Sequence, residues 1–139
     1  MQTLATIVGA TFLLVGILGF MPGITSHLYG GLDFAGHGSQ AKLLHVFQVS
    51  WVHNIVHLAF GIAGLTLART WNGARTYLIG GGVVYLVLWL YGLLVGAGGA
   101  NFVPLNTADD WLHFVLGAAM ISFGFATTRD ESLAERPAT

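Results

Sequence analysis

Four long apolar stretches alternate with short polar segments along the chain. They cover residues 4–20, 49–68, 77–97 and 111–127. At about 1.5 Å of rise per residue, each stretch is long enough to cross the roughly 30 Å hydrocarbon core of a bilayer. Lipid cannot hydrogen-bond to the backbone, so a spanning segment has to be helical. The pattern predicts an all-α, four-helix transmembrane bundle that forms one domain over residues 1–128, followed by a flexible cytoplasmic tail over residues 129–139.

The composition agrees with a membrane protein. Hydrophobic residues make up 55% of the chain, charged residues 8%, and the mean hydropathy is +0.73, whereas about a quarter of the residues of a typical soluble domain are charged. The net charge of −1 and the absence of a basic run exclude a nucleic-acid-binding protein. Because the chain has no cysteine, metal or redox chemistry would have to use histidine, carboxylate or a bound cofactor.

The distribution of basic residues predicts the orientation of the spans. Only Lys42 lies on one side of the predicted membrane, and four residues lie on the other: Arg69, Arg75, Arg129 and Arg136. The positive-inside rule then places both termini in the cytoplasm of a multi-pass plasma membrane protein. We expect the first stretch to be a membrane helix rather than a signal peptide, because no basic residue precedes it and no clear small-residue cleavage site follows it.

The loop of residues 21–48 is rich in glycine and contains His27, His37 and His45, which we expect to be exposed. Aromatic side chains near the predicted outer ends of the second and fourth helices, Trp51 and Trp111, are typical anchors at the lipid headgroups. Within the third stretch, we expect the aromatic residues to serve in packing. These residues are Tyr85, Trp89 and Tyr91.

An internal repeat relates the second and fourth stretches. When the two are aligned without gaps, "HNIVHLAFGIAGL" lies over "DDWLHFVLGAAMI", so that His57 matches His113, Gly61 matches Gly117 and His53 matches Asp109. We interpret the chain as two pseudo-repeated helical hairpins related by an axis along the membrane normal. This relation would bring His57 and His113 to a similar depth in the membrane.

The repeated polar residues share helix faces with small ones. At 100° per residue, His53, His57 and Gly61 lie on one stripe, and Asp109 with His113 and Gly117 on another. Ionisable side chains that face lipid cost several kcal/mol, so both stripes are predicted to face the interior of the bundle. The polar cluster would lie in the outer half of the membrane.

These side chains are typical ligands of a metal or a haem. His53, His57, Asp109 and His113 are the ligand types that zinc, copper or iron accepts, and each pair at i, i+4 can reach a common point. Alternatively, His57 and His113 would be the axial ligands of haem b, with Gly61 and Gly117 leaving room for the ring. The primary hypothesis is therefore a transition-metal or haem site, for electron transfer or sensing. The residues do not assign a reaction.

Two other interpretations remain beside this one. Intramembrane histidines also form proton relays, but no ionisable side chain continues the cluster toward the cytoplasmic side. Alternatively, the histidines only form hydrogen bonds between helices. The chain would then be a structural or accessory subunit, without a cofactor, of a homo-oligomer or a larger complex in the lipid bilayer.

The chain resembles a bacterial family of small four-helix membrane proteins described as a domain of unknown function. The resemblance rests on "HNIVHLAFGIAGL" with Phe47 before it, on "GILGF" in the first stretch, and on "PLNTADDWLHFVLG". It implies an integral membrane protein of four helices and supplies no activity or cofactor. The family pattern carries asparagine where Asp110 stands, so the resemblance does not make Asp110 an obligatory ligand.

Overall fold

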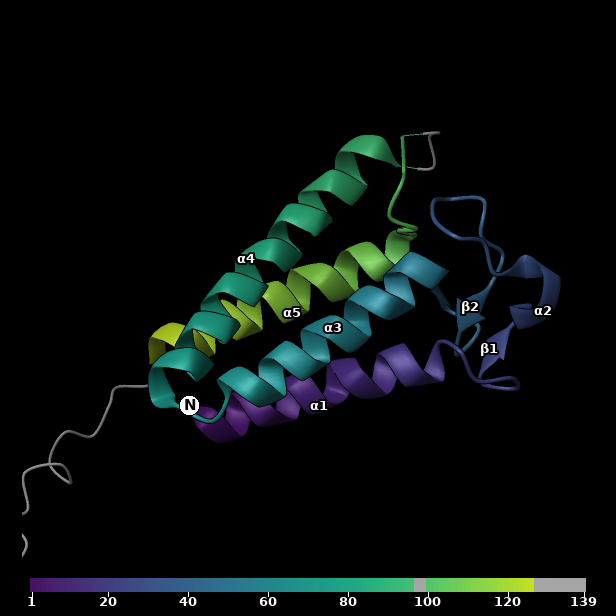
Figure 1. The fold of residues 1–139 in the computed structure, drawn as a ribbon. Helices are drawn as coiled ribbons and strands as arrows, with labels where there is room; N and C mark the ends of the chain where they lie inside the picture. Colours follow the sequence, from purple (N-terminus) through teal and green to yellow (C-terminus); the bar gives the residue numbers. More distant parts are fainter. Residues whose placement is uncertain (97–99, 127–139) are drawn as a thin grey trace, which may run out of the picture.

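The computed structural model describes residues 1–96 and 100–126, which form an all-α protein as predicted. Its long helices are α1 (Gln2–Leu18), α3 (Trp51–Leu67), α4 (Trp71–Val95) and α5 (Thr107–Ala126), and α2 (Leu28–Gly31) is a four-residue turn of helix (Figure 1). The tail predicted for residues 129–139 lies outside the described residues. So do the last residues of the stretches 77–97 and 111–127.

The helix boundaries differ most at the start of α4. This helix begins at Trp71 rather than at residue 77. The Thr70 hydroxyl accepts a hydrogen bond of 3.1 Å from the backbone N–H of Gly73, which is a side-chain cap of the helix N-terminus. Hydropathy missed this turn of helix because Asn72 and Arg75 are polar. The connection between α3 and α4 is therefore shorter than predicted.

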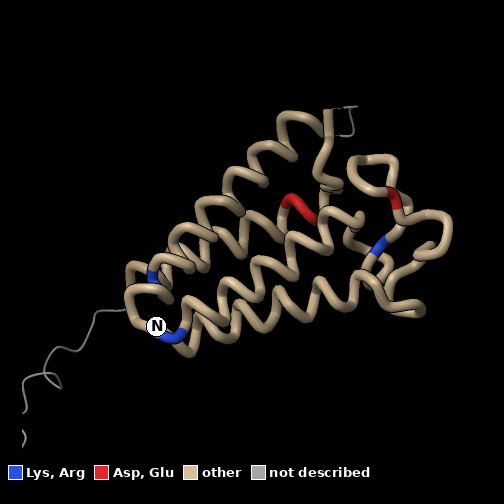
Figure 2. Tube along the Cα trace, viewed as in Figure 1, with Lys and Arg blue, Asp and Glu red and all other residues tan. Residues whose placement is uncertain are grey.

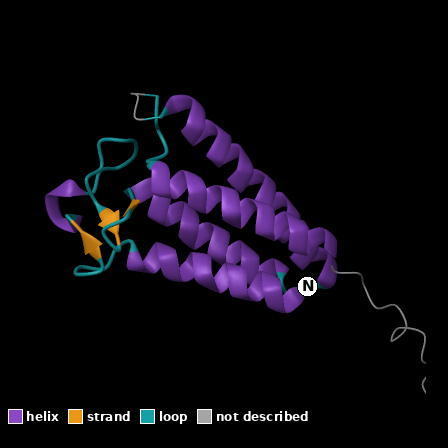
Figure 3. Ribbon diagram, turned by 180° about the vertical axis from the view of Figure 1, so that it is seen from behind, coloured by secondary structure: helices purple, strands orange, loops and turns teal. Residues whose placement is uncertain are grey.

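The segment between α1 and α3 contains a small sheet that the sequence pattern did not predict. Strands β1 (Thr25–Ser26), β2 (Lys42–Leu43) and β3 (Phe47–Gln48) pair antiparallel in the order β1-β2-β3 (Figure 3). Two-residue strands are too short to produce a period-two pattern. The sheet covers one end of the helices and buries Leu43 and the neighbouring Val49 against the last turns of α1.

Glycines bring α1 and α3 into close antiparallel contact. A Cβ on Gly9 would lie 2.9 Å from the backbone nitrogen of Leu65, and one on Gly61 would lie 2.5 Å from that of Leu13. Both distances are shorter than any ordinary contact of a side chain with a backbone. Only glycine at these positions allows the two backbones to lie this close.

Glycines also bring α4 and α5 into close contact. A Cβ on Gly82 would lie 2.8 Å from the carbonyl oxygen of Gly117, and one on Gly117 would lie 2.9 Å from that of Gly82. Gly117 matches Gly61 in the alignment that matches His113 with His57, and Gly82 is the counterpart of Gly9 when α4 is laid on α1. The two pairs are thus built alike, which supports the interpretation of the chain as two repeated hairpins.

A second glycine contact repeats in the same two alignments. In the α1–α3 pair, the side-chain amide of Asn54 packs directly against Gly19. In the α4–α5 pair, the carboxyl of Asp110 packs directly against Gly92. When α4 is laid on α1 so that Gly82 matches Gly9, Gly92 also matches Gly19. When α5 is laid on α3 so that His113 matches His57, Asp110 also matches Asn54. The helix starts agree as well, since the residues that cap α3 and α5, Ser50 and Asn106, are matched in that register too.

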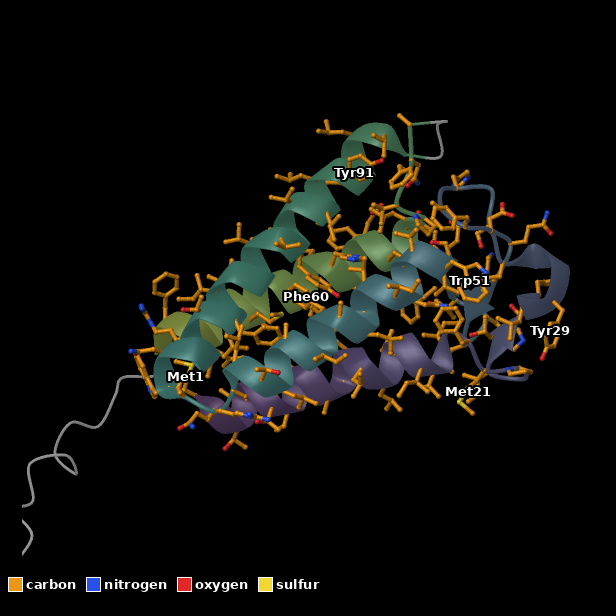
Figure 4. All side chains as sticks on the ribbon, in the orientation of Figure 1. Met1, Met21, Tyr29, Trp51, Phe60 and Tyr91 are labelled. Carbon is orange, nitrogen blue, oxygen red and sulfur yellow. The ribbon has the colours of Figure 1, made fainter. Side chains whose placement is uncertain are left out.

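The main core fills the space between the two pairs at the end that holds the N-terminus. Its largest fully buried side chains are Leu78 and Met120, with Tyr77 packed beside them. Toward the opposite end, α4 diverges from α3, as Figure 4 shows from Phe60 to Tyr91. The protein is therefore well filled at one end and more open at the other.

Among the described residues, only α4 is both long and apolar enough to cross a membrane. Helices α1 and α3 are apolar but shorter, with 17 residues each. Figure 2 shows that charged residues are rare along the helices. Arg69 and Arg75 lie at the start of α4, Lys42 lies in the sheet at the other end, and Asp109 and Asp110 lie in the first turn of α5. The structure thus supplies one candidate span, and a multi-pass arrangement stays a prediction.

Candidate functional site

His57 sits on α3 with one ring nitrogen fixed by its own helix. The Ser50 side chain accepts a hydrogen bond from the backbone N–H of His53, which starts the helix here. Nδ1 of His57 lies 3.0 Å from the carbonyl oxygen of His53, one turn earlier. A carbonyl can only accept, so Nδ1 carries the proton in the neutral imidazole and Nε2 presents a lone pair.

His113 repeats this arrangement on α5. Its side chain is buried, and its Nδ1 lies 2.5 Å from the carbonyl oxygen of Asp109, again one turn earlier. The same argument gives Nδ1 the proton and leaves Nε2 as an acceptor. Within the described part of the chain, Nε2 of His113 makes no hydrogen bond.

Tyr85 of α4 lies between the two histidines. Its ring stacks on the ring of His113, with centroids 4.7 Å apart and an angle of 23° between the planes. Its hydroxyl lies 3.3 Å from Nε2 of His57 and donates to that lone pair. Phe12 of α1 stacks on the other side of Tyr85 at 5.2 Å and meets His57 edge-on at 5.7 Å. The structure therefore places a tyrosine where the sequence analysis expected a metal ion or a haem.

His53 joins the cluster through its ring. The centroids of His53 and His57 are 4.1 Å apart, and Nδ1 of His53 lies 3.4 Å from the side-chain oxygen of Asn54. We call His53, His57, Tyr85 and His113 the His–Tyr cluster.

Asp109 has a structural role. Its Oδ2 accepts hydrogen bonds from the backbone N–H groups of Asn106, at 3.0 Å, and Gln48, at 3.1 Å. The first closes the N-terminus of α5 and the second ties strand β3 to that helix.

Gly61 and Gly117 do not lie beside a free space between the histidines. The backbone of α1 at Leu13 occupies the space next to Gly61, and the backbone of α4 at Gly82 occupies the space next to Gly117. Each glycine serves the contact within its own helix pair. That Gly61 and Gly117 leave room for a haem ring stays a prediction.

The four predicted metal ligands come only partly together. Among the described residues, no three histidine, aspartate or glutamate side chains lie close enough to hold a metal ion. The Tyr85 ring separates His57 from His113, and the Asp109 carboxylate is engaged by backbone donors. His27, His37 and His45 lie in the segment between α1 and α3, outside the cluster, and His45 is exposed at the turn between β2 and β3.

Two cavities share the His–Tyr cluster as a common wall. The α3–α4 cavity has a volume of about 230 Å³ and is otherwise lined by Val52, Val56, Phe60, Val84, Leu88, Phe102, Val103 and Pro104. The α1–α5 cavity has a volume of about 200 Å³ and is otherwise lined by Thr11, Phe12, Val15, Leu43, Leu44, Phe47, Asp109, Leu112 and Leu116. Both cavities are therefore largely apolar, and the His–Tyr cluster supplies polar groups to each.

The two cavities are counterparts in the repeat. Leu88 of α4 matches Val15 of α1, and Leu112 of α5 matches Val56 of α3, in the same two registers as the glycines. The segment before α5 covers the first cavity, and the segment before α3 covers the second. The repeated helix pair thus produces two equivalent cavities around the His–Tyr cluster.

The sequence pattern did not single out Tyr85 and Phe12 as members of the site. Both are buried aromatic residues, and hydropathy alone assigns such residues to packing. A signal was present, because Tyr85 matches Phe12 in the register that matches Gly82 with Gly9. Extending the repeat to the first and third stretches would have placed both aromatic rings beside the histidines.

The fold and the cluster define a small, apolar all-α protein made of two similar helix pairs around a buried histidine–tyrosine centre. The model of one family, described as "Domain of unknown function (DUF4383)", matches residues 2–126. The chain belongs to this family, which confirms the resemblance seen in its sequence. Neither the curated proteins nor the solved structures contain a significant match to it.

Proposed function

We propose that the chain is an integral membrane protein in which all four long helices cross the bilayer and both termini are cytoplasmic. Each helix exposes large apolar side chains on its outward face, for example Leu14, Ile62, Val87 and Val115. In the apolar stretch of α4, only 28% is buried inside the protein, unlike the core helix of a soluble protein. The 17 residues of α1 and of α3 lie at the lower limit for a span.

Within this membrane protein, we propose that the His–Tyr cluster is a binding site for a small organic molecule. The observation that carries the proposal is the pair of largely apolar cavities that share the same histidines and tyrosine as a wall. Ligand sites in proteins are mostly apolar cavities with a few convergent polar groups. The cluster belongs to the outer half of the membrane, because it lies away from Arg69 and Arg75.

A transition-metal ion is the second candidate. It is favoured by the histidine tautomers, because Nδ1 of His57 and of His113 donates to a carbonyl and leaves Nε2 with a lone pair for zinc, copper or iron. Such a site would serve electron transfer or sensing. It requires Tyr85 to leave its place between the two rings. Haem b is less favoured, because it needs that space and the space beside Gly61 and Gly117 as well.

Purification in a mild detergent tests the proposal. The protein is analysed for co-purifying organic molecules by mass spectrometry, for metals by elemental analysis and for haem by its absorbance. We expect about one organic molecule per chain, which is lost in His113→Phe and kept in His45→Phe, a control that changes an exposed histidine. A stoichiometric metal without an organic molecule would favour the second candidate.

One outcome would contradict both candidates. If the protein carries neither a molecule nor a metal, and co-purifies with a larger membrane assembly that His113→Phe leaves intact, the chain is an accessory subunit and the cluster is structural.

A further inference from the structure

We infer that the molecule is a lipid-soluble phenol or quinol, which lies in the α3–α4 cavity and donates its hydroxyl hydrogen to Nε2 of His113. This inference rests on the proposed function and gives the site a ligand chemistry and a position. It follows from three properties of the cluster and the cavity: the hydrogen-bonding capacity that remains free, the polarity and size of the space, and the direction in which it opens.

The free hydrogen-bonding group is an acceptor. The Tyr85 hydroxyl already donates to Nε2 of His57, whereas Nε2 of His113 makes no hydrogen bond within the described residues. Since Nδ1 of His113 holds the proton, Nε2 of the neutral ring can only accept. A complementary ligand therefore has to bring a donor. A hydroxyl group meets this requirement, and an ether or a quinone carbonyl does not.

The α3–α4 cavity suits an aromatic ring better than its counterpart does. Among the described residues, the rest of its wall, outside the His–Tyr cluster, is apolar, whereas the α1–α5 cavity is also lined by Asp109 and Thr11. A dry cavity of roughly 150 Å³ accepts benzene. A space of about 230 Å³ therefore has room for a ring that carries a short substituent.

The cavity opens sideways, between α3 and α4. At its edge, Val56 is 53% exposed and Phe102 is 62% exposed, and both are apolar. Figure 4 shows α4 diverging from α3 between the labelled Phe60 and Tyr91. In a membrane-spanning protein such an opening faces lipid, so a ligand that enters here has to be soluble in the bilayer.

Two matched probes test the chemistry. The protein, purified in detergent, is titrated with 4-butylphenol and with its methyl ether, 4-butylanisole, and binding is followed by the 15N resonances of labelled histidine. The two probes have similar apolar bodies, but only the phenol can donate. We expect the phenol to shift the Nε2 resonance of His113 and to bind about tenfold more tightly, as one hydrogen bond of about 1.4 kcal/mol gives. Equal affinities would overturn the inference.

Two matched variants test the position. Leu88→Phe fills the α3–α4 cavity, and Val15→Phe makes the corresponding change in the α1–α5 cavity. We expect Leu88→Phe to weaken phenol binding at least tenfold and Val15→Phe to leave it within twofold. The opposite result, or an equal loss in both variants, contradicts the choice of cavity. Helical circular dichroism of each variant shows that the fold is retained.

Failure of the inference and failure of the proposed function give different results. If 4-butylphenol does not bind, while the purified protein holds another organic molecule that His113→Phe removes, the ligand chemistry is wrong and the site remains. If neither probe binds and the purified protein carries no organic molecule, both are wrong.

Discussion

The two helix pairs differ where they meet at the centre of the protein. The α1–α3 pair contributes Phe12 next to His57, and the α4–α5 pair contributes Tyr85, at the equivalent position, next to His113. Only Tyr85 has a hydroxyl, which reaches across to His57. Two similar halves thereby acquire different histidines. The acceptor nitrogen of His57 is occupied, whereas that of His113 has no partner among the described residues.

A second difference lies at the starts of α3 and α5. His53 and Asp109 occupy equivalent positions, but His53 lies against the ring of His57, whereas Asp109 binds the backbone of strand β3. The close contacts at Gly9, Gly19 and Gly61 recur in the α4–α5 pair, while the position shared by His53 and Asp109 has diverged. The comparison indicates that packing requires the repeat and that the differences between its halves specify the site.

The largest effect is expected from removing the close helix contacts. A Cβ on Gly61 or Gly117 meets the backbone of the neighbouring helix at 2.5 Å and 2.9 Å, respectively. We expect Gly61→Ala and Gly117→Ala each to lower the free energy of unfolding by about 2 to 3 kcal/mol, as overpacking does. Denaturant titration in detergent, followed by circular dichroism, measures the change.

The control for this experiment is Gly80→Ala. A Cβ on Gly80 meets nothing within 4 Å, and alanine favours helix by about 1 kcal/mol over glycine. We expect this variant to be as stable as the unmodified protein or slightly more stable. If only one of the two contact variants is destabilised, the helix pairs are not equivalent.

Asp109→Ala should have the next largest effect. The substitution leaves the backbone N–H groups of Gln48 and Asn106 without their charged acceptor. We expect a loss of about 2 kcal/mol in the free energy of unfolding. At the equivalent position, His53→Ala removes one longer hydrogen bond and the ring contact with His57. It should cost less, because neither contact involves a charged group. Thermal unfolding of both variants compares them, and an equal cost would contradict the structural role of Asp109.

Tyr85→Phe makes the two aromatic positions alike. It removes one hydrogen bond to His57 and should cost about 1 kcal/mol. The 15N resonance of Nε2 in His57 should move to the position of a free acceptor, close to that of His113. Tyr29→Phe is the control, because this side chain is 84% exposed and should change neither quantity. An unchanged His57 resonance would mean that the hydroxyl does not donate to it.

The smallest change in stability is expected from the reverse substitution, Phe12→Tyr. By the repeat, its new hydroxyl points toward His113 as that of Tyr85 points toward His57. We expect a change of less than about 1 kcal/mol in the free energy of unfolding and a weaker binding of 4-butylphenol, because the free acceptor becomes occupied. Phenol binding that is unaffected by Phe12→Tyr would argue against His113 as its acceptor.

The hydrophobic pattern predicted the number and the approximate positions of the long helices. It failed at the start of α4, where the helix continues through polar residues such as Asn72 because Thr70 caps it. It also missed the three-stranded sheet, whose strands are each two residues long. In both cases local hydrogen bonds, which hydropathy does not measure, determine the structure.

The sequence by itself determined the helical class, the repeat that matches His57 with His113 and the inward-facing histidines. These features depend on periodicity and on the cost of leaving polar groups in apolar surroundings. Only the tertiary structure decided what lies between His57 and His113. Tyr85 comes from a different helix, and its place follows from how Gly82 and Gly117 set the approach of α4 to α5. Contacts between helices depend on shape in three dimensions, which no periodic pattern along one helix contains.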